Sequence, residues 1–113
     1  MKRGEVWTVA GGPDYAGKPR PAVVLQDDAF DATASITICP LTTHAIEAPL
    51  MRLLIEPSER NGLRAVSHLM IDKITTVSKK KLESVVGRLS DEDVVRVNRA
   101  VVVFLGLAGP SGR

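Results

Sequence analysis

The sequence predicts an α+β fold, mainly β, in which a small, strongly curved antiparallel sheet or open barrel is followed by one C-terminal helix. Two observations carry this prediction. Short β-branched and aliphatic runs, separated by glycine, proline and asparagine, fill the chain as far as residue 88. One amphipathic helical pattern then follows. Because 113 residues suffice for one hydrophobic core, we expect residues 1–113 to form a single domain with a loose tail over 107–113.

The strands are bounded by residues that break regular structure. The expected strands are residues 5–10, 21–26, 35–41, 50–56, 65–77 as one bent strand or two short ones, and 83–88. The Gly- and Pro-rich stretch 11–19 predicts a loop, and the acidic stretch 27–34 a turn or a single helical turn. Pro40 is expected to end its strand or to place it at an edge. Asn61-Gly62 is a turn signal, and residues 79–82 suit one helical turn.

The C-terminal helix has a clear beginning and end. Ser90 with Asp93 three residues on forms a capping box, and three acidic residues follow the cap where the helix dipole favours negative charge. Apolar residues recur at helical spacing at Val94, Val97, Val101, Phe104 and Leu105. Gly106 is expected to stop the helix. The apolar face predicts that the helix lies over the sheet.

The composition is that of a globular protein without strong charge. Hydrophobic residues make up 44%, charged residues 25% and the net charge is only +2, which excludes a disordered or polybasic chain. The single cysteine, Cys39, permits no internal disulfide and no cysteine-based zinc site, as suits a reducing compartment. No apolar run approaches the roughly 20 residues of a membrane span. We therefore expect a soluble, cytoplasmic protein without a membrane partner.

Common catalytic motifs are missing from the sequence. There is no Gly-rich phosphate loop and no serine in a nucleophile elbow, and the two histidines are too far apart for a helical metal-binding pair. The acidic residues at 27, 28 and 31 suit a solvated turn better than a cation site. We therefore predict no metal and no cofactor.

Two short segments remain as candidates for chemistry. In Lys18-Pro19-Arg20-Pro21, prolines restrict the backbone on both sides of Arg20 and so aim a guanidinium whose planar fork suits phosphate oxygens. In Pro40-Leu41-Thr42-Thr43, two hydroxyls follow a strand end and suit a phosphate or a developing charge. Each segment also has a simpler interpretation, a surface ion pair for Arg20 and a backbone cap for the hydroxyls.

Taken together, these segments resemble the MazF/PemK/Kid family of toxin–antitoxin endoribonucleases. The resemblance covers nearly the whole chain in order: Arg3-Gly4-Glu5-Val6-Trp7, the Gly-rich loop, Lys18-Pro19-Arg20-Pro21 before aliphatic residues, Pro40-Leu41-Thr42-Thr43, Asn61-Gly62-Leu63, Asp72-Lys73-Ile74 and the capped helix. It implies an SH3-like small barrel of the MazF/CcdB-like toxin fold. It also implies the toxin of a type II toxin–antitoxin system that inhibits translation and growth.

The resemblance further implies a mechanism and partners. The protein would be a homodimer that cuts single-stranded RNA, with mRNA expected, without a metal ion. Attack by the 2′-hydroxyl would leave a 2′,3′-cyclic phosphate and a 5′-hydroxyl. The second partner would be a MazE-like antitoxin whose acidic C-terminal segment lies along the RNA groove.

Site residues are carried over by motif. Arg20 stands at the position of the family's catalytic arginine and Thr42 at that of its catalytic threonine. Lys18 and Thr43 beside them, with Ser67 and His68, are expected to contact RNA. Some relatives carry a carboxylate in the strand after the Asn-Gly turn, whereas residues 67–70 here have none, so no acid–base pair transfers from that strand.

Further roles stay open at this point. His44 is a second contact candidate beside His68, and the Lys79-Lys80-Lys81 run suits either a solvated face or an attraction for phosphates. Two other classes of function compete with the nuclease. A CcdB-like toxin poisons DNA gyrase by protein contact, but it needs neither Arg20 nor Thr42. An SH3-like interaction module would need an exposed aromatic groove, which 4% aromatic residues disfavour.

Overall fold

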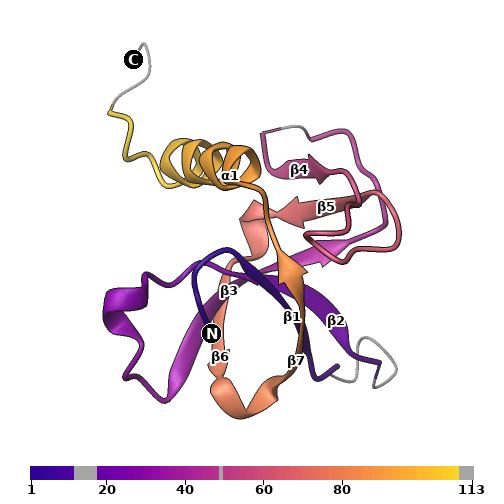
Figure 1. Ribbon diagram of the computed structural model, residues 1–113. Helices are drawn as coiled ribbons and strands as arrows, with labels where there is room; N and C mark the ends of the chain where they lie inside the picture. Colours follow the sequence, from indigo (N-terminus) through magenta and orange to yellow (C-terminus); the bar gives the residue numbers. More distant parts are fainter. Residues whose placement is uncertain (12–17, 49, 110–113) are drawn as a thin grey trace.

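The computed structural model describes residues 1–11, 18–48 and 50–109. Within them, seven strands form an antiparallel sheet in the order β4-β5-β3-β2-β1-β7, with β6 paired to β3, and one helix follows (Figure 1). The strands are β1 (Glu5–Val9), β2 (Arg20–Val24), β3 (Ser35–Thr42), β4 (Arg52–Ile55), β5 (Ser67–Met70), β6 (Thr75–Ser78) and β7 (Leu82–Arg88). The helix is α1 (Asp91–Phe104), and short 3₁₀ turns are η2 (Asp28–Phe30), η3 (Ile71–Lys73) and η4 (Lys79–Lys81).

Strand β3 joins the two parts of the sheet. On one edge its residues 35–38 pair with β6 and its residues 41–42 pair with β5, while on the other edge residues 38–40 pair with β2. The strands β6, β3, β2, β1 and β7 therefore curve into a ring (Figure 1). Within the described chain no ladder joins β6 to β7, which η4 connects along the sequence. The predicted curved antiparallel sheet with one C-terminal helix is confirmed, and its barrel is open.

Pro40 neither ends its strand nor lies at the edge of the sheet. β3 continues to Thr42, and Pro40 pairs with Ala22 of β2. On its other edge, residue 40 falls in the gap between the stretch paired with β6 and the stretch paired with β5. A proline is tolerated because no partner strand requires an N–H from it on that edge.

The other strand predictions hold with adjusted bounds. The segment 65–77 forms two short strands, because η3 interrupts it, and the predicted helical turn after it is η4. The turn at Asn61-Gly62 is held by Asn61, which is buried and whose side-chain oxygen accepts hydrogen bonds from the backbone N–H groups of Ser58 (2.9 Å) and Leu63 (3.0 Å). The predicted loop at 11–19 and tail at 107–113 both extend into residues outside the described ranges.

Two apolar clusters fill the fold. β2 is buried on both faces, because Val23 packs into the larger cluster while Ala22 and Val24 pack into the smaller one inside the ring. This explains why its sequence is a continuous apolar run. The buried members of the larger cluster, which α1 covers, are Val6, Val23, Cys39, Leu41, Ile55, Leu69, Ile71, Leu89 and Val97.

The helix begins as predicted but buries less of its end than expected. The Ser90 hydroxyl accepts a hydrogen bond from the Asp93 N–H at 3.1 Å, and Gly106 ends the helix with φ +73°. Val97 is buried, whereas Phe104 and Leu105 are 43% and 57% exposed. The helix therefore packs on the larger apolar cluster through its first three turns, whereas Phe104 and Leu105 at its end lie outside that cluster. No helix in the described residues has the length and apolarity that crossing a membrane demands.

Candidate active site

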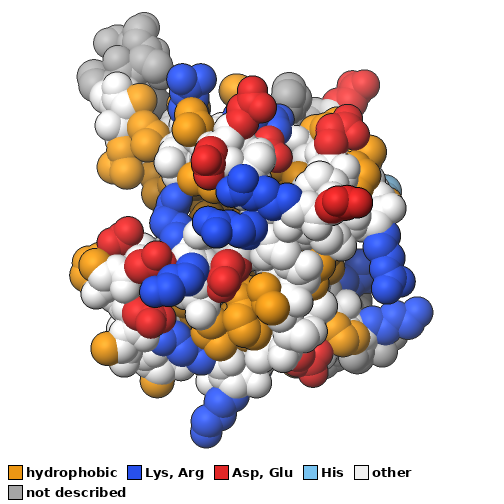
Figure 2. Space-filling view, viewed as in Figure 1, with side chains coloured by type: hydrophobic (Ala, Val, Ile, Leu, Met, Phe, Trp, Pro, Cys, Tyr) orange, Lys and Arg blue, Asp and Glu red, His pale blue; other side chains and the backbone are white. Residues whose placement is uncertain are grey.

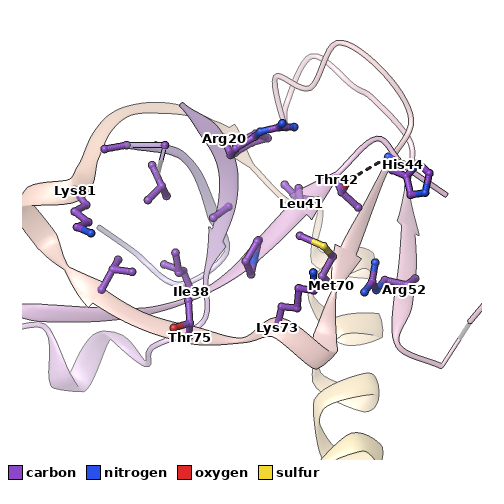
Figure 3. Close-up of a pocket in the computed structure, with 17 residues that line it drawn as sticks. Arg20, Ile38, Leu41, Thr42, His44, Arg52, Met70, Lys73, Thr75 and Lys81 are labelled. Atoms are coloured by element: carbon purple, nitrogen blue, oxygen red, sulfur yellow. Dashed lines mark hydrogen bonds between the residues drawn. The ribbon is translucent and has the colours of Figure 1, made fainter. Parts of the chain in front are cut away.

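A cavity of about 340 Å³ opens at the mouth of the ring of strands. Its wall is built by the end of β1, the start of β2, the second half of β3 and the segment from Met70 to Lys81 (Figure 3). The lining residues are Val9, Ala10, Gly11, Arg20, Pro21, Ala22, Ile38, Pro40, Leu41, Thr42, His44, Arg52, Met70, Lys73, Thr75, Val77 and Lys81. The volume lies within the range of about 300–1,000 Å³ typical of ligand pockets.

Arg20 reaches this cavity from the first position of β2. Its backbone pairs with Val9 of β1, and Pro21 after it pairs with Thr8, so the register with β1 fixes where the arginine emerges. The flanking prolines restrict its backbone further. The exposed residue Arg20 thus lines the cavity from an anchored strand end.

Thr42 reaches the same cavity from the last position of β3. Its Oγ1 accepts a hydrogen bond from the His44 N–H at 3.1 Å (Figure 3). The simpler interpretation, a hydroxyl that caps a backbone group, is therefore correct. It does not compete with a role at the site, because accepting this bond leaves the hydroxyl proton available for a phosphate oxygen.

The cavity has a positively charged rim and an apolar floor. Arg20, Arg52, Lys73 and Lys81 line it, and among them Arg52 is paired with the carboxylate of Asp72, which is not itself a lining residue. The floor is formed by aliphatic side chains such as Ile38. Charges elsewhere are mixed: Figure 2 shows basic and acidic side chains interspersed over that face of the molecule. The small net charge of the chain therefore does not show that positive side chains gather at this cavity.

Arg52 is held in place by a carboxylate from η3. Its Nε donates to Asp72 Oδ1 at 3.0 Å and its Nη2 to Asp72 Oδ2 at 3.1 Å, which is a two-pronged pair. Hydrogen bonding by Arg52 lowers the pKa of the Asp72 carboxyl below its usual value. The pair therefore keeps Asp72 charged and orients Arg52 at the rim.

We expect Asp72→Asn to destabilise the fold at neutral pH by about 1 kcal/mol or less, as for a partly exposed ion pair. Because the folded-state pKa is lowered, this stability is fully present above the unfolded-state pKa near 3.9 and is lost as the pH falls through the folded value. Urea unfolding between pH 7 and pH 3 measures the difference from wild type, which should shrink toward acid. Asp91→Asn is the control, because Asp91 pairs with Arg60 at 3.2 Å while its side chain is 95% exposed. An undiminished difference at pH 3 would contradict this assignment.

Of the other predicted contact residues, most do not line the cavity. Lys18 and Thr43 are exposed neighbours of Arg20 and Thr42 and do not line it. His68 pairs with Thr42 across β5 and β3 and lines a neighbouring depression that shares Arg52 with the cavity. Its Nδ1 is buried with no hydrogen-bond partner among the described residues. His44, by contrast, lines the cavity itself.

Ser67 requires a correction. It is only 4% exposed, its hydroxyl donates to the Ala65 carbonyl at 3.0 Å, and it does not line the cavity. On β5, alternation directs Ser67 with Leu69 toward the interior. The structure therefore does not support the predicted RNA contact of Ser67.

Three cations of the rim were not among the predicted site residues. Lys73 belongs to the Asp72-Lys73-Ile74 motif and Lys81 to the lysine run, so both carried a signal in the sequence. Arg52 had no such signal in the sequence. Its position at the cavity depends on Asp72, which lies on a different element.

Metal binding by the acidic turn and nucleophilic catalysis by Cys39 find little support in the described residues. The acidic turn is occupied by structural contacts: Asp28 accepts from the Arg3 N–H at 2.8 Å, and Asp31 pairs with Lys79 at 3.7 Å. No group of three or more potential metal-ligating side chains is found in the described part of the chain. Burial raises the pKa of the Cys39 thiol to about 12, so this cysteine is not a nucleophile at neutral pH.

Comparison with known proteins identifies the family. The model for "PemK-like, MazF-like toxin of type II toxin-antitoxin system" matches residues 2–105. "Probable endoribonuclease MazF" of Mycolicibacterium smegmatis (strain ATCC 700084 / mc(2)155) is 54% identical over 109 residues, which cover 96% of this chain and 100% of the relative. "Endoribonuclease MazF9" of Mycobacterium tuberculosis (strain ATCC 25618 / H37Rv) is 28% identical over 116 residues, covering 95% and 98%.

Solved structures show the same fold. An endoribonuclease in complex with its cognate antitoxin from Mycobacterial species superposes with a TM-score of 0.80 at 23% identity, covering 97% of this chain and 99% of that one. A MazE-MazF crystal structure (Form-II) from Deinococcus radiodurans gives 0.73 at 20% identity, covering 94% and 95%. Because the family model spans nearly the whole chain and a relative over its full length shares more than half of its residues, the chain belongs to the PemK-like, MazF-like toxins of type II toxin–antitoxin systems and is an endoribonuclease.

Proposed function

We propose that this chain cleaves single-stranded RNA without a metal ion, at the cavity that Arg20 and Thr42 share, and that mRNA is its target. The observation that carries the proposal is the meeting of these two side chains at one positive, apolar-floored cavity. Phosphate oxygens are attracted to the rim, and a base finds apolar surface beside it.

The reaction uses the substrate's own nucleophile. The ribose 2′-oxygen attacks the adjacent phosphorus and loses its proton, the bond from phosphorus to the 5′-oxygen breaks, and that oxygen gains a proton. The products are a 2′,3′-cyclic phosphate and a 5′-hydroxyl. Arg20 stabilises the extra negative charge on the phosphorane, and the Thr42 hydroxyl donates to a non-bridging oxygen. His44 is the one imidazole among the described lining residues, and we propose it as the candidate for exchanging a proton.

The partners follow from the family and from the charge of the cavity. A cavity that attracts phosphates also suits the acidic C-terminal segment of a MazE-like antitoxin, which would block the site. Solved neighbours include an endoribonuclease with its cognate antitoxin and MazE-MazF crystal structures. We further propose that the chain acts as a homodimer in the cytoplasm and that its activity inhibits translation and growth.

The comparisons favour the nuclease over a CcdB-like gyrase poison. The matched relatives are named endoribonucleases, and the cavity holds both Arg20 and Thr42, which binding to gyrase does not require. The SH3-like interaction module receives no support, since the cavity is lined by cations and aliphatic residues.

The experiment is to incubate the purified protein with a long single-stranded RNA in the presence of EDTA and to analyse the fragment ends. We expect cleavage with 2′,3′-cyclic phosphate and 5′-hydroxyl ends. The same RNA with 2′-fluoro groups lacks the attacking hydroxyl and should remain intact. RNA that survives the wild-type protein, or that is cut equally well with 2′-fluoro groups, would refute the proposed mechanism.

A further inference from the structure

The three consecutive lysines of η4 differ in their surroundings. A 3₁₀ turn has three residues per turn, so successive side chains leave it in three different directions. The turn is anchored at both ends. The Ser78 hydroxyl accepts from the Lys80 N–H at 3.3 Å, and the Lys81 carbonyl accepts from the Ala10 N–H of the β1 end at 2.8 Å.

Lys79 is engaged within the protein. Its ammonium group donates to the Asp31 carbonyl oxygen and lies 3.7 Å from the Asp31 carboxylate. This lysine links η4 to the acidic turn after η2. Its charge is partly neutralised, and it does not line the cavity.

Lys80 and Lys81 are both exposed, but only Lys81 lines the cavity. Figure 3 shows the Lys81 side chain within the ring of strands, at the opposite end of the cavity from Thr42 and His44. Arg20 and Lys73 flank the stretch between these ends. An RNA strand that passes Arg20 and Thr42 and continues along the cavity would therefore meet Lys81 after crossing the apolar floor.

The floor between these points suits a nucleobase. Val9 and Val77, both half-buried, give it an aliphatic surface, Ala22 and Ile38 line it from the buried core, and Thr75 adds one hydroxyl. Alternation of charged and apolar surface matches the alternation of phosphates and bases along a single strand. An ammonium group on a flexible stem binds a phosphate as a point charge.

We propose that Lys81 forms a second phosphate-binding subsite at the ring end of the cavity, separate from Arg20 and Thr42, and that the aliphatic floor between them receives a base of single-stranded RNA. This inference rests on the proposed function, because it assumes that RNA enters this cavity. It assigns the lysine run residue by residue: Lys79 is structural, Lys80 is a solvated charge and Lys81 binds the substrate.

The test measures binding of a fluorescent 2′-fluoro RNA of mixed sequence, which is not cleaved, as a function of salt concentration. Each phosphate contact with single-stranded nucleic acid contributes about 0.7 to the slope of log affinity against log salt. We expect Lys81→Gln to lower the slope by about 0.7 and the affinity by about threefold. Lys80→Gln, the matched control in the same turn, should leave the slope unchanged, and Lys81→Arg should restore it.

Each outcome decides the inference. Equal slopes for Lys81→Gln, Lys80→Gln and wild type overturn it, as does an equal loss in all lysine variants, which indicates only long-range attraction. A Lys81→Gln variant that binds RNA normally but loses affinity for a Glu-rich peptide would make this a peptide site and would also overturn the inference. Because the RNA is not cleaved, the result is independent of the cleavage experiment, so failure of the nuclease and failure of this subsite are distinguishable.

Discussion

Arg20→Ala is expected to lower the rate constant of RNA cleavage by about 10²–10³ or more, the effect of removing one preorganised donor from a developing negative charge. Arg20 is an exposed residue at a strand start, so the fold should persist. The loss should fall mainly on the rate of the chemical step, because the charge on the phosphorus oxygens is greatest in the transition state. Single-turnover cleavage with saturating protein measures that step.

Arg20→Lys tests the shape of the side chain separately from its charge. It keeps the positive charge but loses the planar fork that binds two phosphate oxygens, so it should bind RNA nearly as well as wild type and cleave it poorly. Circular dichroism and the thermal midpoint check that both variants are folded. Cleavage by Arg20→Ala at the wild-type rate would remove Arg20 from the mechanism, while the family membership of the chain would stand.

Gly62→Ala is expected to lower the free energy of unfolding by about 2–5 kcal/mol, which sums the cost of a strained backbone and of overpacking. Gly62 has φ +70°, and an added Cβ would lie only 2.2 Å from the Val86 carbonyl oxygen of β7. The backbone cannot relax easily, because the buried Asn61 side chain holds this loop from both sides. Urea unfolding with a constant m-value measures the change.

Gly106→Ala separates the two contributions. Gly106 has a nearly identical φ of +73°, but nothing lies within 4 Å of the position of an added Cβ. This variant should show only the cost of the left-handed conformation, about 1–2 kcal/mol or less at the end of a helix. Equal destabilisation by the two substitutions would show that the close approach to Val86 contributes nothing. Neither glycine lines the cavity, so folded protein of both variants should keep its cleavage rate.

Local interactions made much of this protein predictable from its sequence. The helix begins where the Ser90 side chain accepts a hydrogen bond from a backbone N–H three residues away. The η4 turn is capped by the Ser78 hydroxyl, which accepts from a backbone N–H two residues away. The helix ends at Gly106, which has a positive φ. The prolines beside Arg20 likewise act on neighbouring bonds. Arg20 and Thr42 were predicted as site residues from short motifs and the family resemblance, and the structure adds that both line one cavity.

Contacts between distant segments decided the rest. The opening of the barrel depends on which strands pair with β3 and β1, and the orientation of Arg52 depends on a carboxylate 20 residues away. The burial of Ser67 and the exposure of Phe104 depend on how far β5 and α1 overlap their neighbours. The sequence by itself thus determined the elements, the caps and the chemical groups of the site, since these rest on interactions within a few residues. Only the tertiary structure decided which cations share the cavity, because a side chain's place on the rim depends on long-range pairing that no local pattern encodes.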